Sequence, residues 1–227
     1  MAMTRTKAER VYELMRADIL TGRLPPGSRL RYADLCERYQ TSTGVLREAM
    51  LRLSEQGLVK GEPQQGFQVV ELSVEDLGDL TDARVVLETL VLRSAIADGD
   101  VEWESRILAS HHRLSRTPQR DAADPDRLSD EWVAQHAEFH QTLLDGCTNR
   151  RLKETASSLR AAAELYRRWS LPLGNAADRH VNDEHDELLA AALARDADRA
   201  VESLTKHITL TSNILLDTYA AASTPAS

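Results

Sequence analysis

The sequence predicts a mainly α-helical protein in which an N-terminal winged helix-turn-helix is followed by an all-helical bundle. Apolar residues recur at intervals of three and four over most of the chain, which is the period of an amphipathic helix. Strand-like runs flank a glycine-containing turn between residues 58 and 70. The balance of charge changes after this hairpin. These observations predict two domains, 1–72 and 73–227.

Three helix-like and two strand-like segments make up the first predicted domain. They lie at residues 7–21, 33–39, 43–56, 58–60 and 67–70. Pro25-Pro26-Gly27 breaks the chain after the first helix, Ser42 stands at the N-cap of the third, and Gly57 ends it. This order predicts a helix-turn-helix with a two-stranded wing, a fold that places one helix in a DNA groove.

The second predicted domain is helical throughout. Its helices are expected at residues 75–98, 101–115, 130–145, 149–169, 178–194 and 197–219. Glycine, proline and polar residues separate them, at Gly99, 118–125, Gly146 and 171–174. Amphipathic helices with short connections indicate a bundle whose apolar faces share one core.

The composition is that of a soluble globular protein. Of the 227 residues, 42% are hydrophobic and 28% are charged. No apolar run approaches the roughly 20 residues that span a bilayer, and the N-terminus lacks the apolar core of a signal peptide. The two cysteines are too few for a disulfide scaffold or a structural zinc cluster. We therefore expect a cytoplasmic protein that does not contact membranes.

The net charge of −8 argues against nucleic-acid binding, whereas its distribution argues for it. Residues 1–72 carry 11 basic and 9 acidic residues, a balance of +2, and residues 73–227 carry 17 and 27, a balance of −10. Such asymmetry is typical of a nucleic-acid module joined to an acidic one. Because +2 is weak, DNA affinity must come from locally placed cations. A homodimer would double their number on one duplex.

The start of the third helix and the wing contain the candidate DNA contacts. They are Arg29, Ser42, Thr43, Gly44, Arg47, Arg52, Lys60, Gln65 and Gly66. The first residues of a helix in the major groove reach base edges, so Arg47 can contact a guanine or a phosphate, and Ser42, Thr43 and Arg52 suit phosphate. Gly66 lets the wing approach the duplex closely. In the alternative, these arginines form a solvated face, with Arg47 paired to Glu48 or Glu55.

Four of the seven histidines stand at positions that suit metal binding. His136 and His140 are four residues apart and so share one face of a predicted helix, while His185 and His207 lie on two further helices. Imidazoles from three helices can converge inside a bundle on a divalent ion such as Zn²⁺ or Ni²⁺. The spacing alone equally allows solvated or singly hydrogen-bonded histidines.

Residues 11–69 resemble the N-terminal domain of the GntR family of bacterial transcription regulators. The matching residues are Pro26-Gly27, Leu30, Leu35, Ser42, Arg47-Glu48-Ala49, Leu53, Gly57-Leu58-Val59, Pro63 and Gly66. The resemblance implies binding to double-stranded operator DNA. The family usually has Arg-Thr-Pro where this chain has Thr43-Gly44-Val45, and glutamate where Tyr32 stands. We therefore expect an operator that differs from the commonest family site.

Residues 75–218 resemble the helical FCD ligand domain of the FadR branch of that family. The resemblance rests on residues 82–88, Glu138-Phe139-His140, 149–152, Glu184-His185 and 200–208. Metal-binding members hold a divalent ion with an aspartate and three histidines. The histidines correspond to His140, His185 and His207, and the aspartate position is His136 here. The resemblance implies a homodimer with a zinc or nickel site that takes a small carboxylate effector.

Two further residues are candidates for contacting that effector. The Arg84 guanidinium matches a carboxylate bidentately, although it can instead pair with Asp82 or Glu88. Asn149 can orient the effector or cap the helix that follows it. Replacing the family's aspartate with His136 removes one negative charge, which makes the site more attractive to an anion.

We therefore expect a transcription regulator, not an enzyme, whose operator affinity is controlled by a small carboxylate at the metal site. One alternative is a metal-dependent enzyme that uses the same histidines, with Glu138 or Glu184 as a base. The sequence offers it little, because no His-Glu-x-x-His motif and no glycine-rich phosphate loop occur. The other alternative is a regulator whose effector binds without metal.

Overall fold

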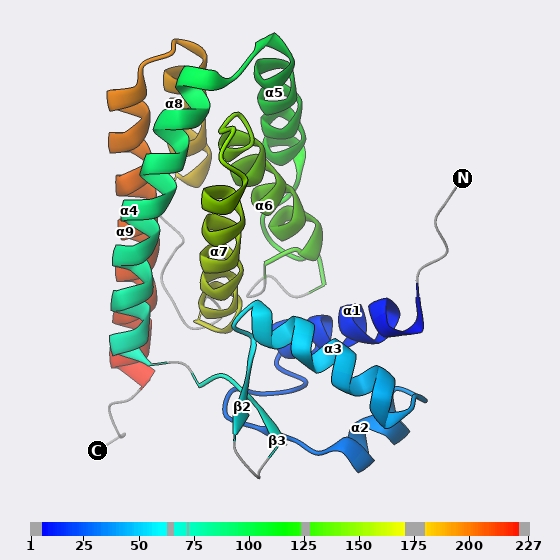
Figure 1. Cartoon of the computed structure of the whole chain (residues 1–227). Helices are drawn as coiled ribbons and strands as arrows, with labels where there is room; N and C mark the ends of the chain where they lie inside the picture. Colours follow the sequence, from blue (N-terminus) through cyan, green and yellow to red (C-terminus); the bar gives the residue numbers. More distant parts are fainter. Residues whose placement is uncertain (1–5, 63–65, 72, 124–127, 171–179, 223–227) are drawn as a thin grey trace. The chain divides into compact units, whose positions relative to one another are not determined.

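Helices make up most of the chain in the computed structural model, which confirms the mainly α-helical class (Figure 1). The structure describes residues 6–62, 66–71, 73–123, 128–170 and 180–222. The chain divides into two compact units. One ends at Ser73 but also takes in Ala161–Trp169, and the other contains Val74–Arg160 and the chain from Ser170 onward.

The first unit has the predicted helix-turn-helix and wing. Its elements are α1 (Lys7–Leu20), β1 (Arg29–Leu30), α2 (Tyr32–Arg38), α3 (Thr43–Glu55), β2 (Val59–Glu62) and β3 (Gly66–Val69). The sequence analysis missed β1, whose two residues are too few to show alternation. Arg29 pairs with Gln68 and Leu30 with Phe67, so β3 is the central strand of a three-stranded antiparallel sheet.

The α3 helix is held in place by its apolar face and by its C-terminal turn. Leu46, Met50 and Leu53 are fully buried against α1 and the sheet. Gly57 has a φ of +68°, a left-handed conformation that favours glycine. The amides that follow α3 donate back to its last turn, from Gly57 to Ser54 and from Leu58 to Leu53. Ser42 occupies the N-cap position as predicted, although its hydroxyl makes no capping hydrogen bond.

A buried carboxylate ties α1 to α2. Asp18 accepts a hydrogen bond from Arg23 at 2.6 Å and from Tyr39 at 2.7 Å, and Arg38 lies 2.7 Å away. Burial raises the pKa of Asp18, but the hydrogen bonds from Tyr39 and Arg23 and the charges of both arginines outweigh it, so the net pKa is lowered. Burial and Asp18 together raise the pKa of Tyr39 well above its ordinary value.

The second unit is built from helices only. They are α4 (Val74–Asp98), α5 (Val101–Arg116), α6 (Asp130–Leu144), α7 (Arg150–Ser170, of which Ala161–Trp169 groups with the first unit), α8 (Val181–Leu193) and α9 (Ala197–Ala222). The long helices α4 and α9 lie side by side (Figure 1). Every predicted helix is present, with its ends within three residues of those predicted.

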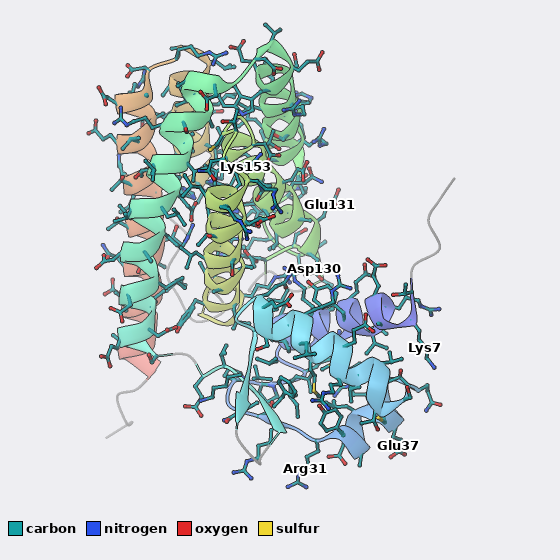
Figure 2. All side chains as sticks on the ribbon, in the orientation of Figure 1. Lys7, Arg31, Glu37, Asp130, Glu131 and Lys153 are labelled. Carbon is teal, nitrogen blue, oxygen red and sulfur yellow. The ribbon has the colours of Figure 1, made fainter. Side chains whose placement is uncertain are left out.

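The ends of the bundle helices are fixed by caps and close packing. Asp100 caps α5 and Ser129 caps α6 through their side-chain oxygens. Asp130 and Glu131 lie in the first turn of α6, where their negative charges interact favourably with the positive end of the helix dipole (Figure 2). A Cβ at Gly99 would lie 2.3 Å from the Trp103 ring, so only glycine allows this approach. Among the described residues, no helix combines the length and apolarity needed to cross a membrane.

Replacing Asp18 with asparagine should lower the free energy of unfolding by about 2 kcal/mol at pH 7, because hydrogen bonds to a charged group are worth roughly 1.5–3 kcal/mol. The pKa of Asp18 is lower in the folded than in the unfolded chain, so its contribution is present above the unfolded pKa of about 4. It is lost as the pH falls through the folded value. In urea unfolding, the difference in free energy of unfolding between wild type and Asp18→Asn should therefore become smaller below about pH 4.

The matched control is Glu37→Gln, which neutralises an exposed carboxylate on α2 (Figure 2). It should leave stability within about 0.5 kcal/mol of wild type. Equal stabilities of Asp18→Asn and Glu37→Gln at pH 7 would contradict this account of the network.

Candidate metal centre and nucleic-acid interface

The four predicted histidines come together in the helical unit. His136 and His140 project from one face of α6, His185 comes from α8, and His207 comes from α9. All four are buried, and one ligand atom from each lies within 4.8 Å of the others. Their ring centroids are 4.5–5.8 Å apart. Three helices thus deliver four imidazoles to one point.

The chemistry of this cluster fits a divalent transition metal. The Nε2 atom of His140 is buried and has no hydrogen-bond partner among the described residues. Burial holds the pKa of His140 well below its usual value, and a proton on His207 or His185 and the charges of Arg160 and Arg84 lower it further. His140 is therefore neutral at physiological pH and keeps a lone pair for a metal. Imidazole donors suit Zn²⁺, Ni²⁺ and Cu²⁺, whereas Mg²⁺ and Ca²⁺ prefer oxygen.

One acidic residue touches the cluster from outside. The Glu184 carboxylate lies 2.7 Å from Nδ1 of His207, linking α8 to α9. From the sequence, Glu184 was expected only as a possible base in the enzyme alternative. The only hint of this contact in the sequence is that Glu184 directly precedes His185. That position does not reveal that Glu184 contacts His207.

Aromatic rings wall the cluster. Trp132 stacks on His136 with its ring centroid 4.8 Å away. Phe139 presents its edge to His140 at 5.3 Å and to His185 at 5.2 Å. These buried rings keep water away from the imidazoles, which strengthens electrostatic interactions within the site.

The two candidate effector residues, Arg84 and Asn149, both have partners within the helical unit. Arg84 donates from Nε to the buried Glu88 carboxylate at 2.7 Å. This is one of the two ion pairs that the sequence left open for Arg84. The charge of Arg84 also lowers the pKa of His140. Asn149 accepts a hydrogen bond from the Leu152 amide and so caps α7. Arg160, which the sequence analysis did not single out, also acts on His140 and donates to the Ala137 carbonyl.

The first turns of α3 present the predicted DNA contacts to solvent. Ser42, Thr43, Gly44 and Arg47 are exposed. Within the described part of the chain, Arg47 pairs with neither Glu48 nor Glu55. It therefore projects from the surface without the intramolecular ion pair that the alternative required.

The remaining predicted DNA contacts differ in how exposed they are. Arg52 is half-buried with its guanidinium 4.4 Å from the Tyr12 ring centroid, so it packs against α1. Arg29 and Lys60 are exposed on β1 and β2. Gly66, the first residue of β3, has a φ of +87°, which favours glycine there. Gln65 lies outside the described residues.

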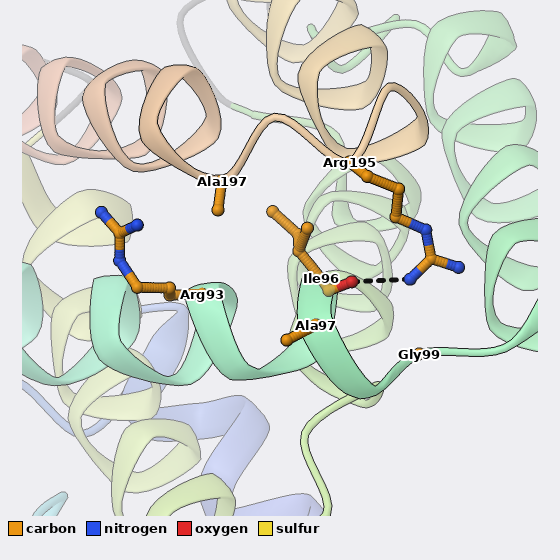
Figure 3. Close-up of a pocket in the computed structure, with 6 residues that line it drawn as sticks. All are labelled: Arg93, Ile96, Ala97, Gly99, Arg195 and Ala197. Carbon is orange, nitrogen blue, oxygen red and sulfur yellow. Dashed lines mark hydrogen bonds between the residues drawn. The ribbon is translucent and has the colours of Figure 1, made fainter.

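A hollow elsewhere in the helical unit has no cluster of metal-binding side chains in its lining. It is open and lined by Arg93, Ile96, Ala97, Gly99, Arg195 and Ala197 (Figure 3). Both arginines already have acidic partners, since Arg93 pairs with Asp198 and Arg195 with Glu104. Arg195 also donates to the Ile96 carbonyl at 2.6 Å. The hollow therefore lies at the junction of the end of α4 with the α8–α9 connection and the start of α9.

Two family models match the chain. Residues 7–69 match the bacterial regulatory proteins of the gntR family, and residues 79–210 match the FCD domain. Together they cover the helix-turn-helix with its wing and most of the helical unit, including all four histidines.

Curated relatives and solved structures agree with these matches. The chain is 40% identical over 207 residues to an uncharacterized HTH-type transcriptional regulator, BphR, of Paraburkholderia xenovorans, covering 91% of this chain and 84% of that protein. It is 36% identical over 202 residues to the HTH-type transcriptional repressor GlaR of Escherichia coli, covering 87% and 90%. In fold it is similar to McbR/YncC of E. coli, with a TM-score of 0.77 at 20% identity over 95% of this chain and all of that one.

Proposed function

This chain belongs to the GntR family of DNA-binding transcription regulators and carries an FCD domain, and we propose that a small carboxylate at its four-histidine metal site controls its affinity for operator DNA. The relatives are transcription regulators, so the metal-dependent enzyme is set aside. One observation carries the proposal. Four buried imidazoles converge from three helices, and the Nε2 atom of His140 has no hydrogen-bond partner among the described residues.

Burial makes a bound cation the natural explanation of this cluster. A buried polar atom left without a hydrogen bond costs roughly 1–3 kcal/mol, and native structures contain few of them. His140 is neutral, so its unpartnered nitrogen can act as a metal ligand. An all-imidazole donor set favours Zn²⁺, with Ni²⁺ as an alternative.

The charges around the cluster favour an anionic effector. Neutral imidazoles contribute no negative charge, Arg84 and Glu88 balance each other, and the positive charge of Arg160 offsets the Glu184 carboxylate. When bound, the divalent ion supplies positive charge to which a carboxylate oxygen can bind. Arg84 uses Nε for Glu88, and its terminal nitrogens have no hydrogen-bond partner among the described residues. They remain able to bind one carboxylate bidentately.

The outer face of α4 supports the proposal of a homodimer. Ala83, Val86 and Leu90 are exposed and follow the spacing of one heptad stripe, which Arg93 and Ala97 continue. Val86 is 71% exposed and Leu90 is 52% exposed. Burying such a stripe against the same stripe of a second copy would remove apolar surface from water. A dimer would then offer two α3 helices to two half-sites, and the effector would favour one dimer geometry through its differential affinity.

Zinc should stabilise the full-length protein, and the carboxylate that acts as effector should stabilise it further only when metal is bound. A thermal-shift screen of small carboxylates, run with chelator and with Zn²⁺, measures both effects. His140→Ala should abolish the response to zinc, because it removes a ligand. The matched control His112→Ala, an exposed histidine on α5, should retain it.

Equal stabilisation by a carboxylate with and without metal would support the metal-free alternative. No zinc response in the wild type would contradict the metal site.

Arg47→Ala should weaken operator binding about tenfold or more, since a good base contact is worth roughly 1–3 kcal/mol. Fluorescence anisotropy with a duplex selected by the wild-type protein gives the affinity. Arg106→Ala removes the same charge from an exposed position on α5 and should change affinity less than twofold. Equal affinities of both variants would remove Arg47 from the interface.

The double variant Val86→Glu/Leu90→Glu should convert a dimer into monomers, because two copies would then oppose four carboxylates in an apolar seam. Sedimentation velocity measures the mass. Leu108→Glu changes a similarly exposed leucine, 47% exposed on α5, and should leave the dimer intact. A dimer that survives both glutamates would place the interface elsewhere.

A further inference from the structure

Glu184 and His207 form a contact that the proposed metal site does not by itself explain. Glu184 directly precedes His185 on α8, and its carboxylate lies 2.7 Å from Nδ1 of His207 on α9. The side chains are 16% and 7% exposed. We propose that Glu184 is the positioning residue of the metal centre. This inference rests on the proposed function, because it assigns Glu184 the task of presenting one ligand.

The contact determines which nitrogen of His207 can bind a metal. A carboxylate only accepts hydrogen bonds, so Nδ1 of His207 carries the proton and donates to Glu184. A neutral imidazole has one N–H, so Nε2 keeps its lone pair. Glu184 therefore selects the tautomer of His207 in which Nε2 is the ligand, and it fixes the orientation of the ring.

The helical geometry explains how Glu184 reaches His207 and not the centre of the cluster. Consecutive residues on a helix point about 100° apart, so Glu184 and His185 cannot face the same point. However, α8 packs against α9. The side chain of Glu184 meets the outer nitrogen of His207, while His185 faces the other three rings.

Glu184 also supplies negative charge that the four histidines lack. The family pattern has an aspartate as one ligand, and this chain has His136 there. A carboxylate bonded to the far side of a ligating imidazole raises the basicity of that ligand. Through the His207 ring, the Glu184 carboxylate would thereby stabilise the cation without contacting it. Losing such an outer partner typically lowers metal affinity by about 10–100-fold.

Three variants separate the charge from the hydrogen bond. Glu184→Gln keeps an oxygen that can accept from Nδ1 but removes the charge, whereas Glu184→Ala removes both. Glu187→Gln is the matched control, one turn further along α8, with a side chain 46% exposed. The melting temperature of each metal-free variant establishes that it is folded. Because glutamine is isosteric with glutamate, the comparison holds even if the alanine variant does not fold.

The first measurement is a zinc titration of the full-length protein in competition with a chromophoric chelator. We expect Glu184→Ala to lose about 10–100-fold in affinity, Glu184→Gln to lose less, and Glu187→Gln to match wild type. Affinities of the folded Glu184 variants within twofold of wild type would overturn the inference while leaving the metal site intact. Failure of the wild type to bind zinc would overturn the proposed function as well.

The second measurement needs no metal. Long-range nitrogen–proton NMR correlations of the metal-free protein report which nitrogen of His207 is protonated. We expect protonation at Nδ1 in wild type and Glu187→Gln, and its loss in Glu184→Ala. A wild-type His207 protonated at Nε2 would overturn the inference, whatever the zinc affinity is.

Discussion

Burying four imidazole rings among three helices is the constraint on which the helical unit depends. Each ring carries two polar nitrogens, and each nitrogen removed from water needs a partner. Glu184 satisfies the outer nitrogen of His207, and Trp132 and Phe139 pack against the ring faces and edges. The inner nitrogen of His140 has no such partner among the described residues. The proposed cation at the centre would resolve this imbalance and at the same time hold α6, α8 and α9 together.

The DNA-binding unit meets a comparable requirement with a carboxylate in place of a cation. Asp18 is buried, and it is stabilised as an anion by Tyr39, Arg23 and Arg38. This network secures α2 against α1, while the buried face of α3 and the turn at Gly57 secure α3. The exposed Arg47 is therefore carried on a rigid helix. Under the proposed function, the ligand acts at the histidine site while α3 keeps one shape.

Local periodicity and the family pattern were enough to predict the helices and the grouping of the four histidines. The helices were found because each carries an apolar stripe at helical spacing, and the four histidines were grouped because their positions match a known ligand pattern. The sequence did not determine which charged side chains pair. Glu184 with His207, and Arg84 with Glu88 in preference to Asp82, depend on side-chain directions that one sequence does not determine. The strand β1 was missed because two residues show no alternation, and Asn149 proved to cap α7.

The central claim is that His136, His140, His185 and His207 together bind one divalent transition metal. X-ray absorption at the zinc edge of the zinc-loaded full-length protein tests it most directly, because imidazole rings give a characteristic multiple-scattering pattern. The account predicts a first shell dominated by nitrogen at about 2.0–2.1 Å, with scattering from four imidazoles. A spectrum that contains sulfur, or at most one imidazole, would contradict it.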